Sequence, residues 1–207
     1  INDSTTNGPT LANGYWFGRS VENIGDLDGD GVNDLAVGAK NDDDAGTDRG
    51  AVYILFMNVD GSVKSTVEII DPTTNGPKLR NNDQFGYSIE SISDLNGDGV
   101  NDLVVGAFSD NGSAEQQAIN YGNIHILFLN TDGSLARSTV EVRDDTTNGP
   151  TLSADDGFGS SIANMGDLDG NGYDDLAVGA VFDDNGGSNR GAVHILFMNA
   201  DGAVESA

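Results

Sequence analysis

The sequence reads Asp26-Leu27-Asp28-Gly29-Asp30-Gly31-Val32-Asn33-Asp34 and continues at once into Leu35-Ala36-Val37-Gly38-Ala39, the stretch that decides the fold. The acidic pattern returns as DLNGDGVND at Asp94–Asp102, before LVVGA, and as DLDGNGYDD at Asp167–Asp175, before LAVGA. The three copies begin 68 and 73 residues apart. A pattern that returns at such an interval predicts a repeat architecture with one acidic loop in each repeat.

The acidic loop predicts a metal site, because carboxylates crowded into a compact turn repel one another unless a cation lies among them. Side-chain oxygens at positions 1, 3 and 5 can turn inward, the backbone carbonyl of position 7 can join them, and position 9 closes the cage. Oxygen donors without His or Cys select a hard cation, and a flexible loop suits Ca²⁺ better than Mg²⁺. The glycine at position 6 supplies the sharp turn.

Two alternatives to a calcium loop follow from the same residues. An EF-hand begins in a similar way, but it needs a bidentate Glu at position 12 and helices on both sides. Position 12 here is Val37, Val105 or Val178, each inside a short apolar run that predicts a buried strand. The other alternative is a solvated acidic turn without an ion, and three copies in register, each before a strand, argue against it.

The composition points away from nucleic acid. The chain of 207 residues carries 9 Lys and Arg against 34 Asp and Glu, a formal net charge of −25, and no cysteine. This charge favours cations or basic surfaces as partners, and three Ca²⁺ ions would offset six of the negative charges. No apolar run approaches the roughly 18 residues of a membrane span, and the opening INDSTTNGPT is no signal peptide. Because extracellular calcium fills even weak loops, an extracellular or cell-surface location is expected.

Other short motifs recur at the same spacing as the acidic loop. Phe-Gly pairs come nine residues before each loop, and the runs GAVYILF, GNIHILF and GAVHILF follow it. Turn residues bound four predicted strands in each repeat, and no helical periodicity of useful length is present. In the second repeat the predicted strands run from Gly86 to Ile92, Leu103 to Ala107, Asn123 to Leu129 and Ser138 to Val142. The longer second interval is explained mainly by the loop Ser109–Tyr121.

The combination of FG, DLDGDGVNDL, VGA and GAVYIL resembles the FG-GAP repeat of integrin α-subunit propellers and of large bacterial surface proteins, over nearly the whole chain. We therefore expect an all-β fold, a β-propeller-type repeat with three four-stranded blades. The resemblance implies Ca²⁺, about one ion per repeat and three in all, in the loop that joins the first two strands of each blade. The GAP triplet departs from the family, since it reads Gly-Ala-Lys, Gly-Ala-Phe and Gly-Ala-Val, a change that should not affect the ion.

The family's metal positions carry over onto five residues in each loop. In the first loop they are Asp26, Asp28, Asp30, the carbonyl of Val32, and Asp34. In the second they are Asp94, Asn96, Asp98, the carbonyl of Val100, and Asp102. In the third they are Asp167, Asp169, Asn171, the carbonyl of Tyr173, and Asp175. The second and third loops hold fewer carboxylates, which predicts weaker calcium binding there than in the first.

The pattern divides the chain into three repeats, residues 1–68, 69–140 and 141–207. Propellers usually have about four to eight blades, so three blades do not close a ring alone. We expect either part of a larger ring or array, or several copies that meet head to tail.

Some residues outside the loops also recur. Tyr53, His125 and His194 share one strand position, which predicts a structural slot for a ring rather than metal ligands. The acids at 42–44 and at 183–184 could extend a calcium site, but solvated loop charge is the expected role. Trp16 has no aromatic equivalent in the other repeats, so exposure there would indicate a ligand contact and burial a packing role.

Three functions stay open. The first is a calcium-binding extracellular module for adhesion or for interaction with a protein or glycan. The second is a structural repeat unit of a large extracellular or filamentous assembly, whose partners are further copies of itself. The third is an accessory domain of a secreted hydrolase. No enzymatic activity is expected, because no nucleophile, base and orienter constellation is recognisable, although an active site built from carboxylates alone stays open.

Overall fold

A computed structural model describes residues 1–111 and 120–207 of the chain. These residues form twelve strands in the order β1 (Phe17–Gly25), β2 (Asp34–Ala39), β3 (Ala51–Met57), β4 (Val63–Ile69), β5 (Phe85–Ile92), β6 (Asp102–Ala107), β7 (Asn123–Leu127), β8 (Val140–Val142), β9 (Phe158–Gly166), β10 (Asp175–Ala180), β11 (Ala192–Met198) and β12 (Val204–Ser206). Within the described part no helix is long and apolar enough to cross a membrane. Part of the loop Ser109–Tyr121, residues 112–119, lies outside the described residues.

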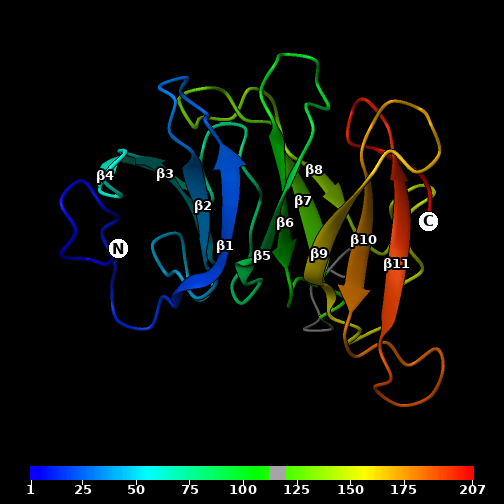
Figure 1. The fold of residues 1–207 in the computed structure, drawn as a ribbon. Coiled ribbons are helices and arrows are strands. Elements are labelled where there is room, and N and C mark those ends of the chain that lie inside the picture. The colour runs from blue at the N-terminus through cyan, green and yellow to red at the C-terminus, as the bar shows by residue number, and fades with distance from the viewer. Residues whose placement is uncertain (112–119) are drawn as a thin grey trace.

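The strands form three four-stranded antiparallel sheets, β1 to β4, β5 to β8 and β9 to β12, each in chain order. Figure 1 shows the sheets standing side by side, with β1 packed against β5 and β5 against β9. The expected all-β fold of three four-stranded propeller blades is therefore confirmed. The division of the sequence at 68/69 and 140/141 stays a prediction; the sheets span residues 17–69, 85–142 and 158–206.

The predicted strands of the second repeat lie where expected, with shorter third and fourth strands. β7 ends at Leu127, because the chain then leaves the ladder and Leu129 makes an isolated antiparallel bridge with Leu135. The fourth strand is reduced to three residues, Val140–Val142, which pair with β7. Propensity predicts the apolar run correctly, but the point at which a strand leaves its ladder depends on the neighbouring turn.

Each pair of neighbouring sheets encloses a hydrophobic core. Between the first two sheets Ile54 and Phe56 pack in one cluster with Phe85 and Leu103. Between the second and third sheets Ile126, Phe128, Phe158 and Leu176 repeat that arrangement. The run GAVYILF and its copies thus supply one side of each core, and the FG phenylalanine with the strand after the acidic loop supplies the other.

The third sheet presents its outer face without a neighbouring sheet among the described residues. Val52 and Ile124 are 0% exposed, whereas Val193 at the equivalent repeat position is 68% exposed. Met165 and Phe182 in the third repeat are also large exposed hydrophobic residues. The same sequence pattern is therefore core in the first two repeats and surface in the third.

Backbones of adjacent sheets meet at glycines. A Cβ added at Gly106, in β6, would lie 2.2 Å from the carbonyl oxygen of Gly159 in β9, and Gly38 meets Gly86 in the same way at 2.0 Å. The hydroxyl of Ser88 donates a hydrogen bond of 2.7 Å to that same Gly159 carbonyl. The glycines of VGA and of FG thus allow close contact between neighbouring blades, because only a residue without a side chain fits there.

Candidate calcium loops

The three acidic loops lie at one end of the molecule, between the first and second strands of their sheets, at the top of Figure 1. The first and second loops flank a shallow groove that is lined by Asp26, Asp28, Gly99 and Val100. The structure therefore places the predicted ligands of these two neighbouring loops on the same face of the propeller.

Each loop is folded by its own side chains. In the first loop the carboxylate of Asp26 accepts hydrogen bonds from the N–H groups of Asp30 (2.9 Å) and Gly31 (2.8 Å). Asp28 accepts a bond of 3.2 Å from the N–H of Asp30, and Asp30 accepts one of 2.9 Å from the N–H of Val32. The second and third loops repeat all four bonds at the equivalent positions. Short polar side chains favour such local turns, so the sequence of the loop determines its shape through local hydrogen bonds.

These bonds leave oxygens free for a cation. At positions 3 and 5 of the first loop, Oδ1 of Asp28 and of Asp30 accepts a backbone N–H, and Oδ2 of each accepts a hydrogen bond from Lys64 and none from the loop backbone. A hard divalent ion requires several such oxygens that converge on one point. Carboxylate oxygens of Asp26, Asp28 and Asp34 lie within 4.8 Å of one another, as do those of Asp167, Asp169 and Asp175.

Not every predicted ligand is drawn together. Asp30 is not among the three converging acids of the first loop, although its Oδ2 and that of Asp28 both pair with Lys64. The second loop holds no group of three converging acids, since its position 3 is the amide Asn96. The backbone carbonyls of Val32, Val100 and Tyr173 stay predicted ligands.

The acid at position 9, a predicted ligand, also accepts hydrogen bonds within its sheet. Asp102 is 0% exposed, and its two carboxylate oxygens accept the N–H groups of Leu95 (3.0 Å) and Leu129 (3.2 Å). The equivalent acids accept the same two bonds. Asp34 accepts the N–H groups of Leu27 and Met57, and Asp175 accepts those of Leu168 and Met198. Burial raises the pKa of Asp102 to about 7, and the two N–H donors oppose that rise. A bound divalent cation would favour the ionised form in the same way as the donors.

Lys64 places an ammonium group against two predicted ligands of the first loop. Its Nζ lies 2.6 Å from Oδ2 of Asp28 and 2.7 Å from Oδ2 of Asp30. The equivalent residues in the second and third repeats are Ala136 and Glu205, so only this loop has an ammonium group there. These hydrogen bonds raise the pKa of Lys64 well above its usual range. Oδ2 of Asp28 and Oδ2 of Asp30 therefore converge on one cationic group, the ammonium of Lys64.

Sequence reasoning was wrong about two acids outside the loops. Asp42 and Asp183 were expected to be solvated loop charge, but both are 1% exposed, and Asp110 at the same repeat position is 2% exposed. In each case the residue's carbonyl accepts the N–H of the glycine that opens the third strand. The signal was available, since an Asp follows VGA at the same distance in all three repeats.

The opposite end of the sheets carries a row of aromatic and cationic side chains, which we call the aromatic row: Trp16, Lys40, Arg19, Tyr87, Phe108 and Phe182. Lys40 Nζ lies 4.5 Å from the Trp16 ring centre, and the Arg19 guanidinium lies 3.8 Å above Tyr87. Tyr87 stacks on Phe108 at 4.4 Å, and Phe108 meets Phe182 at 6.1 Å. Trp16 is 61% exposed, which is the outcome that indicates a ligand contact rather than packing.

Comparison with known proteins agrees with this geometry. The FG-GAP repeat family matches residues 17–55, 85–119 and 158–196. The chain is 35% identical to integrin alpha-PS5 of Drosophila melanogaster over 170 residues, which are 81% of this chain and 15% of that protein. It is 34% identical to integrin alpha-3 of Cricetulus griseus over 174 residues, 82% of this chain and 14% of that protein. It is also 34% identical to integrin alpha-11 of Homo sapiens over 169 residues, 81% of this chain and 13% of that protein.

Proposed function

This chain belongs to the FG-GAP repeat family, and we propose that it is a calcium-ordered, integrin-like propeller module that acts in adhesion at a cell surface or outside the cell. The observation that carries the proposal is that the same four hydrogen bonds fold all three acidic loops, and that in the first loop Oδ2 of Asp28 and of Asp30 already binds a cationic group, the ammonium of Lys64. The chain spans only 13 to 15% of the length of the integrin alpha subunits named above, so its partner is part of the proposal.

Calcium would serve structure in this module. When bound, the ion supplies positive charge that offsets the crowded carboxylates of the loop. Positions 1, 3 and 5 would hold it from the loop, and position 9 would hold it from the start of the second strand. Because the position-9 carboxylate also binds the end of the third strand, the ion would connect the loop to three strands of one sheet. The all-oxygen donor set favours Ca²⁺ over a transition metal.

The aromatic row is the proposed partner surface. Trp16 has a left-handed backbone conformation with φ of 58°, which is costly for a bulky side chain. The equivalent residue of the third repeat, Gly157, has a similar φ of 65°. An exposed tryptophan held in that conformation beside Lys40 suits contact with a protein or a glycan.

A binding screen against matrix proteins and glycans tests this function. We expect a partner that the chain binds in calcium and loses in chelator, and whose affinity falls at least about tenfold in Trp16→Ala, as for an aromatic hot spot. Val59→Ala, a change of another exposed hydrophobic residue, is the control and should bind normally. A partner that Trp16→Ala holds with full affinity would remove the aromatic row from the proposal.

Lys64 should compete with calcium in the first loop. Replacing it by Ala frees Oδ2 of Asp28 and of Asp30, so calcium affinity at this loop should rise roughly two- to fivefold, the size expected for an exposed ion pair. Isothermal titration of Lys64→Ala measures the change, with the exposed Lys78→Ala as the control. Unchanged or weaker binding would show that the ammonium and the ion do not share a position.

A structural role in a larger assembly is the second candidate, and one observation favours it. The outer face of the third sheet exposes Val193 and Met165, which a neighbouring sheet of another copy would cover. Light scattering against concentration separates the two: growth of the particle with concentration supports assembly, and a constant mass supports the adhesion module.

A further inference from the structure

One position of the third strand holds a tyrosine in the first sheet and a histidine in the second. Tyr53 and His125 occupy the same position of the third strand, and each ring packs edge-on against the FG phenylalanine of its repeat, at 5.6 and 5.4 Å. The ring faces the same two kinds of acid in both sheets. One is the Asp that follows VGA, and the other is a Glu paired with the ring across the third and fourth strands: Asp42 and Glu68 in the first sheet, Asp110 and Glu141 in the second.

In the first sheet a hydroxyl fills the slot. The hydroxyl of Tyr53 lies 2.7 Å from Oδ2 of Asp42 and 2.8 Å from Oε1 of Glu68. Burial raises the pKa of both acids and, as the largest cause, the pKa of Tyr53 itself. The polar tip of this ring is therefore satisfied by protein atoms alone.

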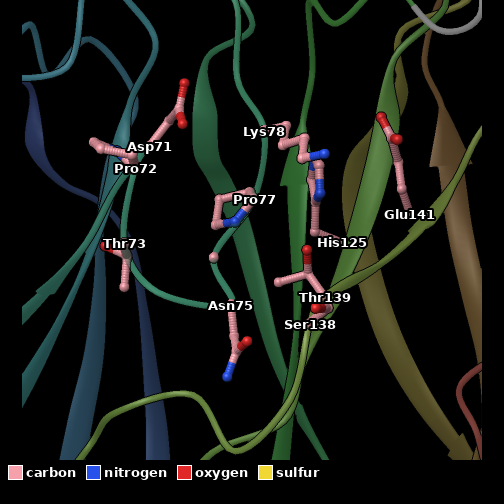
Figure 2. Close-up of a pocket in the computed structure, with 11 residues that line it drawn as sticks. Asp71, Pro72, Thr73, Asn75, Pro77, Lys78, His125, Ser138, Thr139 and Glu141 are labelled. Atoms are coloured by element: carbon pink, nitrogen blue, oxygen red, sulfur yellow. The ribbon is translucent and has the colours of Figure 1, made fainter.

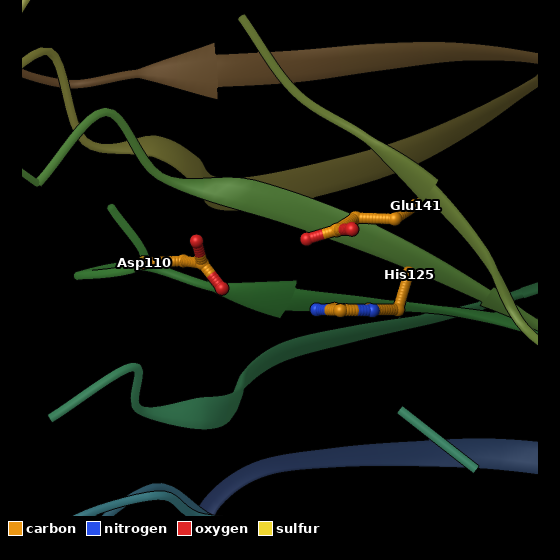
Figure 3. Close-up of side chains that lie close together, drawn as sticks. All are labelled: Asp110, His125 and Glu141. Atoms are coloured by element: carbon orange, nitrogen blue, oxygen red, sulfur yellow. The ribbon is translucent and has the colours of Figure 1, made fainter. Parts of the chain in front are cut away.

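In the second sheet the ring is shorter and ends in nitrogens that bond to nothing in the described part of the chain. His125 is 1% exposed, and neither Nδ1 nor Nε2 has a hydrogen-bond partner there. One ligand atom each of Asp110, His125 and Glu141 lie within 4.8 Å of one another. Figure 3 shows the nitrogen edge of the ring directed toward Asp110, with the Glu141 carboxylate beside it. A buried polar ring without a partner is rare and requires an explanation.

We propose that Asp110, His125 and Glu141 bind a divalent transition-metal ion of the Zn²⁺ class, at a second kind of metal site that is distinct from the calcium loops. One imidazole nitrogen and two carboxylate oxygens form a donor set that suits Zn²⁺, whereas Ca²⁺ prefers oxygen alone. A metal ion binds the neutral imidazole through the lone pair of one ring nitrogen.

The surroundings hold one ligand in place. Asn123 Nδ2 donates a bond of 2.6 Å to Oε1 of Glu141, and the Arg143 guanidinium lies 3.3 Å from Oε2. Such outer contacts orient metal ligands and leave each carboxylate oxygen a second lone pair. Arg143 and Arg80 are the cations that act on Glu141, and Asp110 is hydrogen-bonded to the buried Asp83. Neither arginine bonds to the imidazole, and both of its nitrogens stay without a hydrogen-bond partner in the described residues.

An entry path leads to the site. His125 and Glu141 form part of the wall of an open pocket of about 460 Å³, whose other walls are residues 71–73 and 75–78 and Ser138 with Thr139. Figure 2 shows the ring of His125 reaching this pocket between the two walls. The ring nitrogens themselves are buried, so the pocket brings solvent to the wall that His125 and Glu141 form, one residue layer from the nitrogens.

The test is a zinc titration of the folded 207-residue chain in excess CaCl₂, which occupies the calcium loops. We expect one saturable Zn²⁺ site, and visible absorption from Co²⁺ bound in its place. His125→Tyr reproduces the first sheet's arrangement and should weaken Zn²⁺ binding at least about 100-fold, as expected when a direct ligand is lost. Tyr53→His, the reverse change, should add a second Zn²⁺ site between Asp42 and Glu68.

Two further variants supply a control and a second ligand substitution. In the third sheet His194 Nε2 lies 3.9 Å from Asp183 Oδ2 without a third ligand in the described residues, so His194→Tyr should leave Zn²⁺ binding unchanged. Glu141→Gln keeps the side-chain shape and should weaken binding at least about tenfold even if His125→Tyr does not fold. Zn²⁺ binding that survives both His125→Tyr and Glu141→Gln, or its absence from the folded wild-type chain, overturns the proposal.

Discussion

Gly106→Ala is expected to separate the second and third blades. Its new Cβ would lie 2.2 Å from the carbonyl oxygen of Gly159 and 2.4 Å from the hydroxyl oxygen of Ser88, far inside van der Waals contact. A backbone carbonyl in the next sheet cannot move without shifting that sheet, so the methyl group should cost about 3 kcal/mol or more. Chemical denaturation measures the loss.

Gly179→Ala is the matched control, because it makes the same change at the same repeat position. Its added Cβ would meet only the hydroxyls of Ser161 (2.5 Å) and Ser160 (3.1 Å), which can rotate away. We expect a loss below about 1 kcal/mol, as for a change that flexible side chains absorb. Equal losses in the two variants would show that the glycine serves the strand itself and not the contact between blades.

Asp102→Ala should be the most damaging change in the second acidic loop, with or without calcium. The variant leaves the buried N–H groups of Leu95 and Leu129 without an acceptor, and each such loss costs about 1 to 3 kcal/mol. The expected destabilisation is therefore about 2 to 6 kcal/mol, measured by denaturation in EDTA so that no ion contributes.

Asp98→Ala supplies the comparison within the same loop. Asp98 is exposed and accepts one bond, from the N–H of Val100, so its loss should barely change stability in EDTA. The same variant should lower the calcium stoichiometry by one ion in a titration. If Asp102→Ala is as stable in EDTA as the wild type, the position-9 acid is a metal ligand alone and does not support the fold.

The repeated pattern predicted most of the architecture. Because LAVGA and GAVYILF alternate with turns at fixed spacing, the four strands of each repeat and the place of the acidic loop followed from local chemistry. Asp26, Asp28 and Asp30 fold their loop with bonds that span at most five residues, and local bonds of this kind are readable in a sequence.

Contacts between distant residues were not readable in the same way. The approach of Gly106 to Gly159, and of Lys64 to the first loop, depends on how strands and sheets pack, which no local pattern specifies. The equivalence of Tyr53 and His125 was visible and predicted a structural slot for a ring, but the phenylalanine against which each ring packs was not predicted. What the slot faces became apparent only with the pairing of the third and fourth strands, which brings Glu141 beside His125.

Calcium-dependent melting tests the central claim most directly, that the three acidic loops hold Ca²⁺ and that the ions stabilise the blades. At a calcium concentration 100 times the dissociation constant, each occupied site adds about 2.7 kcal/mol. For a chain of this size 1 kcal/mol corresponds to about 2 to 4 °C, so EDTA should lower the melting temperature by more than about 10 °C. Added Ca²⁺ should restore it, and equimolar Mg²⁺ should not. Identical melting curves in EDTA and in excess Ca²⁺ would contradict the account and leave the loops as hydrogen-bonded turns without an ion.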